Sequence, residues 1–190
     1  MNAPPTQQCP TPSDADASAP ETGDESTHPH PVSATVALLP LMMDPETPRF
    51  RWDTKLMANE AAGPNARLRA RPRLTVARWS GDVDLAAQVI DKLVDNAARH
   101  GKPFSDDCVH VRLTVLSETD ELRIEVDDAD ASFPDFDAIV SGSHPRGRGL
   151  WWVQRYGGRL SWEVKRDDDE RVVGKTVTAV MQPAGGREAA

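Results

Sequence analysis

The chain has 190 residues and a net charge of −8, with 22 basic and 30 acidic side chains. This length can form one domain with a full hydrophobic core, and the negative charge argues against a nucleic-acid partner, because phosphate contacts need a basic surface. The sequence has no apolar run long enough to span a membrane, no secretory signal pattern and too few cysteines for a disulfide framework, so we expect a cytoplasmic protein.

Two segments precede the predicted domain. Residues 1–33 contain seven prolines, five acidic side chains and no lysine or arginine. They cannot bury enough apolar surface to offset the entropy of ordering, so we predict a disordered tail. Residues 34–63 form an extension of undecided structure, in which 34–39 favours a short strand and 55–61 favours one or two helical turns ended by a Gly-Pro pair. Just beyond it, 65–79 shows both helical spacing and strand alternation, and a proline interrupts any long helix.

The best-defined element is a helix over 84–99. Its apolar side chains recur every three or four residues and form one stripe: Ala86, Val89, Ile90, Leu93, Val94 and Ala97. Asp82 or Asp84 is a suitable N-cap, and Gly101 is a suitable C-cap. The pattern is typical of a helix that covers a hydrophobic core.

The order of the remaining elements predicts the fold class. They are strands at 108–117 and 122–126, a polar loop at 127–148, a helix at 149–156, and strands at 159–165 and 176–182. Helices and strands in this order are typical of an α+β fold, a two-layer sandwich in which helices cover one face of a mixed, mostly antiparallel sheet. The domain is expected over 64–183, with a flexible C-terminus at 184–190.

Three short stretches carry candidate chemistry, and each has a plain structural explanation by itself. The end of the predicted helix reads DKLVDNAARHG and includes Asn96, which alone is typical of a helix-border residue bonded to water. VDDADASFP ends a predicted strand with Asp128, which can accept a hydrogen bond from a ligand amine but is equally typical of an acidic turn. HPRGRGLWWV leads a glycine-rich loop into a helix, which suits phosphate but is also typical of a flexible turn.

Together and in this order, the stretches resemble the GHKL nucleotide-binding superfamily, named for gyrase, histidine kinases and MutL, over roughly 64–183. LVDNAARHG is similar to its N-box, and the resemblance places Asn96 at the magnesium-binding asparagine. VDDADASFP is similar to its first glycine box, with Asp128 at the adenine-binding aspartate and with Asp130 and Ser132 in place of the two glycines. The implied fold is the Bergerat-type, or histidine-kinase-like, ATP-binding fold.

The other implied ATP contacts lie further along the chain. GRGL is similar to the second glycine box, the hinge of a lid over the phosphates. This box consists of Gly147, Arg148, Gly149 and Leu150. YGGRLSWEV followed by GKTVTAVMQP is similar to the closing hairpin of the superfamily, with Thr176 at its G-x-T position near the adenine. The resemblance therefore implies ATP and Mg²⁺ as cofactors, with Asp130 also at a cofactor-binding position and Asn96 as the metal ligand.

The resemblance leaves catalysis undecided. In the kinase and ATPase branches a glutamate four residues before the asparagine activates the nucleophile, and here that position holds Lys92, a cation at neutral pH and a poor base. We therefore assign no catalytic residue. The leading hypothesis is an ATP-binding regulator similar to the anti-sigma-factor serine kinases of actinobacteria. The alternatives are a catalytically degenerate domain that acts as a protein-interaction module and, less favoured by the proline-rich 28–63 region, the catalytic half of a two-component histidine kinase.

The partners that the resemblance implies are proteins. A sigma factor or an anti-anti-sigma-like regulator fits the branch, a homodimer stays open, and neither a nucleic acid nor a membrane is expected. In the helix after GRGL, either Trp151 or Trp152 is expected to pack against the sheet as a core residue.

Overall fold

The computed structural model of the chain describes residues 47–134, 136–142 and 148–185, all within one compact unit. The expected tail and the expected strand over 34–39 lie outside the described residues. The elements run β1 (Pro48–Met57), α1 (Ala62–Val76), α2 (Val83–His100), β2 (Cys108–Leu116), β3 (Leu122–Asp128), α3 (Phe136–Val140), α4 (Arg148–Arg155), β4 (Gly158–Arg166) and β5 (Val172–Met181). In these residues no helix is long and apolar enough to cross a bilayer.

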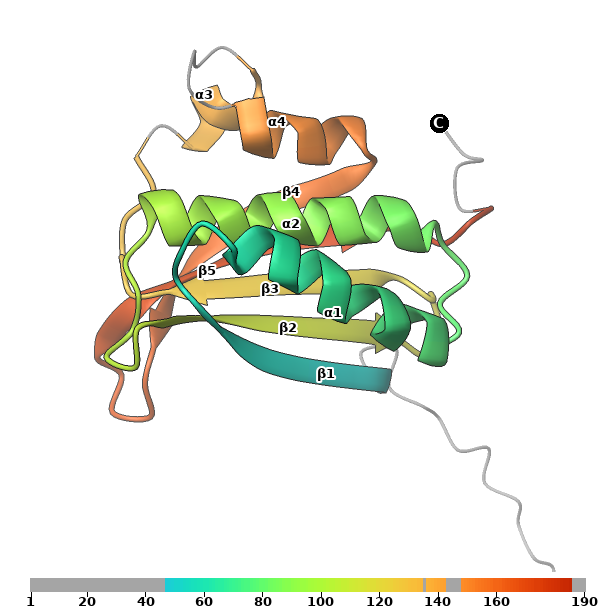
Figure 1. Cartoon of the computed structure of the whole chain (residues 1–190), viewed down its shortest axis with the longest axis horizontal. Helices are drawn as coiled ribbons and strands as arrows, with labels where there is room; N and C mark the ends of the chain where they lie inside the picture. Colours follow the sequence, from blue (N-terminus) through green and yellow to red (C-terminus); the bar gives the residue numbers. More distant parts are fainter. Residues whose placement is uncertain (1–46, 135, 143–147, 186–190) are drawn as a thin grey trace, which may run out of the picture. The chain divides into compact units, whose positions relative to one another are not determined.

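The five strands form one sheet in the order β1-β2-β3-β5-β4, and α1, α2 and α4 pack on one of its faces (Figure 1). The predicted α+β class, with helices on one face of a sheet, is confirmed. Each of the four strand pairings is antiparallel, so the described sheet is more regular than the mixed sheet that we expected. The opposite face, which none of the described helices covers, is the open face.

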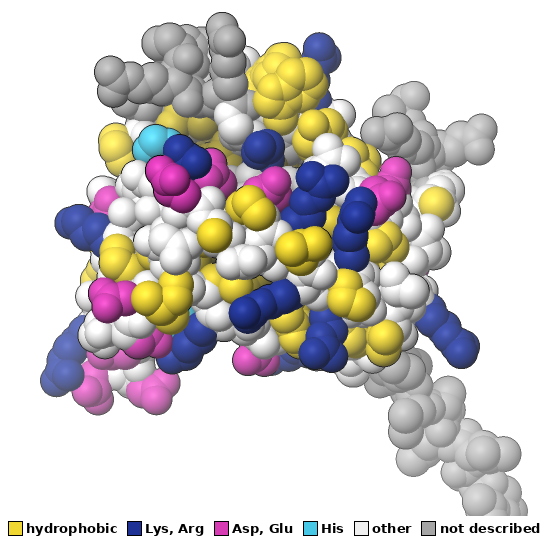
Figure 2. All heavy atoms as spheres, viewed as in Figure 1, with side chains coloured by type: hydrophobic (Ala, Val, Ile, Leu, Met, Phe, Trp, Pro, Cys, Tyr) yellow, Lys and Arg dark blue, Asp and Glu magenta, His cyan; other side chains and the backbone are white. Residues whose placement is uncertain are grey.

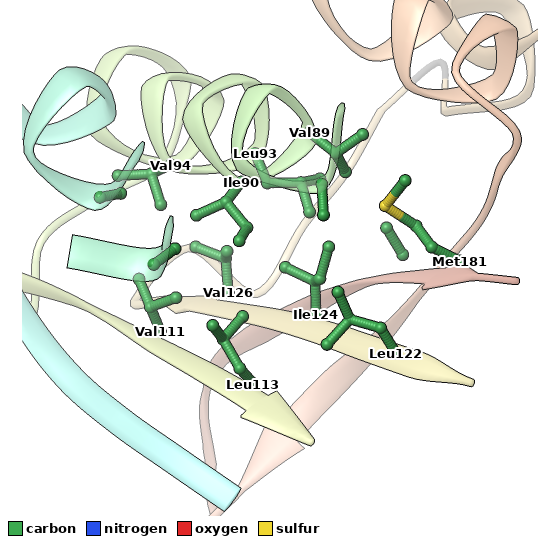
Figure 3. Packing of buried hydrophobic residues seen from close by; sticks show 14 of the residues in the cluster. Val89, Ile90, Leu93, Val94, Val111, Leu113, Leu122, Ile124, Val126 and Met181 are labelled. Atoms are coloured by element: carbon green, nitrogen blue, oxygen red, sulfur yellow. The ribbon is translucent and has the colours of Figure 1, made fainter. Parts of the chain in front are cut away.

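The core lies between α2 and the middle of the sheet. Val89, Ile90 and Leu93 of α2 point toward Ile124 and Val126 of β3 (Figure 3). All five side chains are almost completely buried. Full burial of an aliphatic side chain contributes about 1.5–3 kcal/mol, so this layer is a main source of stability.

The predicted central helix is confirmed together with its caps. Asp82 Oδ1 accepts a hydrogen bond from the backbone N–H of Leu85 at 2.9 Å, which satisfies one of the free N–H groups of the first turn. At the other end the backbone N–H of Gly101 donates to the carbonyl of Ala97 at 3.0 Å. The end of α2 is therefore fixed, and this end carries the candidate asparagine.

The helical turns predicted over 55–61 are wrong, because most of this stretch completes β1 or the turn after it. β1 pairs with β2 along its length, and Trp52 and Leu56 alternate toward the helices. Alternating polar side chains and nearby prolines hid this pattern. The expected extension over 34–63 therefore contributes an edge strand to the same sheet.

The undecided stretch over 65–79 is mostly helix, since α1 continues to Val76. The Gly-Pro pair begins this helix instead of ending one, because Pro64 lies in the first turn, where a backbone N–H has no intrahelical partner. The buried side of α1 consists of small residues and one leucine: Ala62, Gly63, Ala66, Ala70 and Leu74. Pro72 lies on the exposed side.

Two details of the C-terminal half differ from the prediction. A short helix, α3, interrupts the expected polar loop, and β5 begins at Val172, four residues before the predicted strand. The expected packing of a tryptophan against the sheet is also wrong. Leu150 and Val153 of α4 are buried in the core, whereas Trp152 is exposed and Trp151 lies against Gly142. Residues three apart share one helix face, so the two adjacent tryptophans point elsewhere.

Candidate functional site

The strongest candidate site lies where the end of α2 meets the end of β3 and the start of β5. Asp128 is the last residue of β3, and its register partner on β5 is Lys175. A Cβ atom at position 101 would lie 2.5 Å from Asp128 Cγ, so only glycine lets the chain after α2 come this close. Gly174 has a similar role, since its Cβ would lie 2.0 Å from the carbonyl oxygen of Asp128.

Asp128 and Lys175 form a buried ion pair on the helix-covered face. The Lys175 Nζ donates to Asp128 Oδ1 at 2.8 Å, and the two residues are 3% and 0% exposed, respectively. The backbone N–H of Asp130 donates to the same oxygen at 2.9 Å. Burial raises the pKa of Asp128, and the bond from Lys175 opposes that increase. The pair brings two compensating charges into the interior.

The second carboxylate oxygen of Asp128, Oδ2, is not part of this ion pair. Oδ2 is buried and forms no hydrogen bond of good geometry with the described residues, although the nearby backbone N–H of Lys102 also acts to lower the pKa of this carboxylate. An unsatisfied buried acceptor costs about 1–3 kcal/mol, and most buried polar atoms in native proteins have a partner. Asp128 is therefore suited to accept a hydrogen bond from a ligand or from water.

Lys175 is similarly incomplete. An ammonium group has three N–H donors. Besides the bond to Asp128, the described part of the chain gives it one further acceptor, the carbonyl oxygen of Asp130 at 3.1 Å. The Nζ also lies 5.6 Å from the centroid of the Phe133 ring. One donor of the ammonium and one acceptor of Asp128 thus remain next to each other.

Asp130 stabilises its own loop. Its Oδ1 accepts from the backbone N–H of Ser132 at 3.1 Å and from the Ser132 hydroxyl at 3.0 Å. The backbone bond from Ser132 is the largest of the effects that lower the pKa of Asp130. The two residues that replace the glycines of the first box therefore bond to each other, and the Asp130 carboxylate is charged.

Asn96 lies half-buried near the end of α2, one turn after Lys92 and on the same helical face. Asp91 and Asp95 face α1 instead, because a Cβ on Gly63 of α1 would lie 2.3 Å from Asp91 Oδ1 and 3.3 Å from Asp95 Cβ. The two aspartates are thus turned away from the face with Asn96. Where the chain is described, no three His, Cys, Asp or Glu residues could hold a metal together. A Mg²⁺ at Asn96 would need ligand and water oxygens, which Mg²⁺ commonly keeps.

The second glycine box is described only in part, since Gly147 lies outside the described residues. Arg148 is the first residue of α4, and Leu150 is buried in the core beneath that helix. A Cβ on Gly149 would meet none of the described atoms within 4 Å. The described residues therefore do not require glycine at position 149, and they leave the backbone there open to approach.

Thr176 is not brought together with Asp128. Its hydroxyl donates to Asp127 Oδ1 at 2.8 Å, and these two residues are register partners on the open face. Successive side chains of a strand point to opposite faces, so Lys175 lies beside Asp128, whereas Thr176, which the resemblance implied near the adenine, lies on the other face. Lys175 was not predicted as a site residue, because the predicted strand began at 176. Gly174 could have indicated it, since a glycine within a strand often marks a place where another backbone segment comes close.

No protein-family model matches the sequence, and no curated protein is significantly similar to it. The histidine kinase domain from the Erythrobacter litoralis EL346 blue-light activated histidine kinase has 21% identity over 54% of this chain and 45% of that chain, with a TM-score of 0.38. A second structure, of the Erythrobacter litoralis EL346 blue-light activated histidine kinase, has 22% identity over 57% of this chain and 34% of that chain, with a TM-score of 0.39. The chain thus covers less than half the length of either.

Proposed function

We propose that this chain is a cytoplasmic ATP-binding regulatory protein with a histidine-kinase-like ATPase domain. The observation that carries the proposal is Asp128, which is 0% exposed and has a carboxylate oxygen without a partner in the described structure. The amino group of adenine is a donor that such an oxygen can accept. Gly101 and Gly174 let two further segments close around this carboxylate.

The remaining contacts follow from where the other residues lie. Asn96 supplies an amide oxygen for the Mg²⁺ that ATP carries on its phosphates. The phosphates lie toward the N-terminus of α4, where backbone N–H groups and the helix dipole favour anions, and the open backbone at Gly149 allows them to come close. Leu150 anchors α4 in the core and supports this end of the site from below.

Calorimetric titration of the full chain with Mg-ATP tests the proposal. The wild type should bind, and Asn96→Ala should weaken binding by about tenfold or more, since a charge-assisted contact contributes roughly 1.5–3 kcal/mol. Without Mg²⁺ the two proteins should bind ATP alike. Asp95→Ala is the matched control, because Asp95 is adjacent in sequence but pairs with Arg99. If wild type and Asn96→Ala both give no heat of binding, the nucleotide proposal fails.

Turnover of ATP is a separate question. Lys92 holds the position of the expected catalytic base, so the second candidate function is a degenerate domain that acts as an interaction module without hydrolysis. Lys92→Glu decides between the two, because it restores a carboxylate one turn before Asn96. An increase in ATP turnover would show that Lys92 blocks catalysis. No change would place the defect elsewhere, for example in the Asp130 loop.

A protein partner, such as a sigma factor or an anti-anti-sigma-like regulator, would need a docking surface, and we propose the outward face of α1. An apolar stripe runs along it at every fourth residue: Pro64, Leu68, Pro72 and Val76. Leu68 is 69% exposed and Val76 is 74% exposed. The same helix carries four arginines and no acidic residue. Basic and apolar side chains lie next to each other on the face that carries α1 (Figure 2), which suits an acidic amphipathic segment.

Site-specific photo-crosslinking in cells tests this surface. A crosslinker at position 68 should capture an acidic protein, whereas one at the exposed turn residue Thr119 should not. Reversing the neighbouring charges with Arg69→Glu and Arg73→Glu should remove the crosslink. Capture of a second copy of this chain would identify a homodimer instead, and equal capture at both positions would contradict the proposal.

A further inference from the structure

We propose that Lys175 determines base specificity at this site, by donating a hydrogen bond to the N1 atom of adenine while Asp128 accepts one from the adjacent amino group. This inference rests on the proposed ATP binding and adds a residue to it. The ion pair places the two groups together, because Lys175 Nζ lies 2.8 Å from Asp128 Oδ1. The unpartnered Oδ2 is therefore next to a donor of known position.

The ammonium is held in place before any ligand arrives. Lys175 has a side chain only 4% exposed, and its two acceptors lie on the end of β3 and on the following loop. With two of three N–H donors used, one donor remains, and on Asp128 one acceptor remains. A ligand edge that meets this pair must present an acceptor and a donor side by side.

Adenine presents such an edge, since N1 is an acceptor and the adjacent amino group is a donor. Guanine presents an acceptor and two donors, so one of its donors would lose water without gaining a partner, which disfavours it. Because the ammonium is charged, its hydrogen bond to N1 is stronger than one from a neutral hydroxyl. Lys175 in this position thus favours adenine and strengthens its binding.

The surroundings of Lys175 on the helix-covered face are apolar. Phe133 packs edge-on against Phe136 with ring centroids 5.0 Å apart and lies 5.9 Å from Trp162. Trp162 is on β4, opposite Val177 of β5. Hydrogen bonds are stronger where water is excluded, so a mismatch at this edge is more costly than at an exposed site.

Binding of ATP analogues to the full chain tests the role of Lys175. In 1-deaza-ATP a C–H group replaces N1, and in 3-deaza-ATP it replaces N3, which lies away from the proposed contacts. The wild type should bind 1-deaza-ATP about tenfold to hundredfold more weakly than ATP, as expected for a lost charge-assisted hydrogen bond, and should bind 3-deaza-ATP like ATP. GTP should also bind more weakly. Lys175→Met should bind ATP and 1-deaza-ATP equally.

The possible results distinguish the role of Lys175 from ATP binding itself. If the wild type binds ATP and both deaza analogues equally, Lys175 does not contact N1, and the inference is overturned while ATP binding stands. If ATP itself does not bind, both are overturned. Preserved discrimination in Lys175→Met would also overturn the role of the lysine. The wild-type comparison decides alone if Lys175→Met does not fold.

Discussion

Two adjacent aspartates at the end of β3 show how the two faces of the sheet differ. Asp127 and Asp128 are 3% and 0% exposed, and each accepts a hydrogen bond from a lysine. On the open face both oxygens of Asp127 are occupied, Oδ1 by the Thr176 hydroxyl and Oδ2 by Lys165 at 2.7 Å. On the helix-covered face one oxygen of Asp128 has no described partner.

Burial and pairing alone do not identify a ligand site. Asp127 belongs to a filled network that also includes Arg112, 3.5 Å away, and such a network holds neighbouring strands together. Asp128 is as deeply buried, but its bonding capacity is incomplete. The unused bonding capacity, and not the charge, is the difference on which the proposed ligand contact of Asp128 rests.

The largest expected difference between the two aspartates is in stability. Lys175→Met leaves an uncompensated charge at a fully buried carboxylate and should lower the free energy of unfolding by about 3–5 kcal/mol. Lys165→Met should cost only about 1 kcal/mol, because Asp127 keeps two other partners and the lysine side chain is partly exposed. Urea denaturation of the two variants measures both values. Equal losses would mean that the two pairs are equivalent.

The next effect is on nucleotide affinity. In Asp128→Asn the single amide oxygen should remain with Lys175, which turns the amide NH₂ toward the adenine amino group. Two donors then face each other, so the affinity for Mg-ATP should fall about 100-fold, or by about 2.7 kcal/mol. Asp127→Asn should leave the affinity unchanged, because this residue faces the other side of the sheet. A comparable loss in both variants, measured by calorimetry, would contradict the separation of the two faces.

How well the sequence predicts this site depends on strand register. The helix α2 and the strands β2 and β3 follow from strict periodicity in their apolar residues. The start of β5 does not, because Gly174 and Lys175 interrupt its apolar alternation. Adjacent residues of a strand face opposite sides of the sheet, so Thr176, implied near the adenine by resemblance, lies on the open face and Lys175 lies beside Asp128.

The first two elements of the domain, β1 and α1, were difficult to predict for a different reason. The buried side of α1 consists mainly of alanines, whereas Leu68 and Val76 face outward, so the usual rule that large apolar residues mark the buried face gives the wrong side. In β1, Asp53 and Lys55 alternate with residues that face the helices, and the strand lies at the sheet edge. The sequence predicted β2 and β3 better than the edge strand β1.

Thr176→Val tests directly whether Thr176 acts on the open face and not at the adenine site. Loss of the hydroxyl leaves Asp127 Oδ1 without its 2.8 Å bond and should lower stability by about 1 kcal/mol. The affinity for Mg-ATP should not change, since the side chain lies on the open face. Thermal unfolding and calorimetry measure the two quantities. A reduced affinity with unchanged stability would return Thr176 to the adenine site.

The smallest expected effect is on the pH dependence of stability. Burial raises the pKa of Asp128 in the folded protein above its ordinary value of 3.8. Between that value and the raised pKa the folded state holds a proton that the unfolded state has lost, so this group makes the free energy of unfolding fall as the pH rises through the window. Asp106, Asp120 and Asp130 have lowered pKa values and act in the opposite direction.

The measurement compares wild type with Asp128→Asn. Both proteins contain Asp106, Asp120 and Asp130, so the contributions of these three residues cancel in the difference between the two free energies of unfolding. That difference, measured by urea denaturation, should therefore decrease as the pH rises from 3.8 and then level off; an increase over the same window would mean that Lys175 outweighs burial at Asp128.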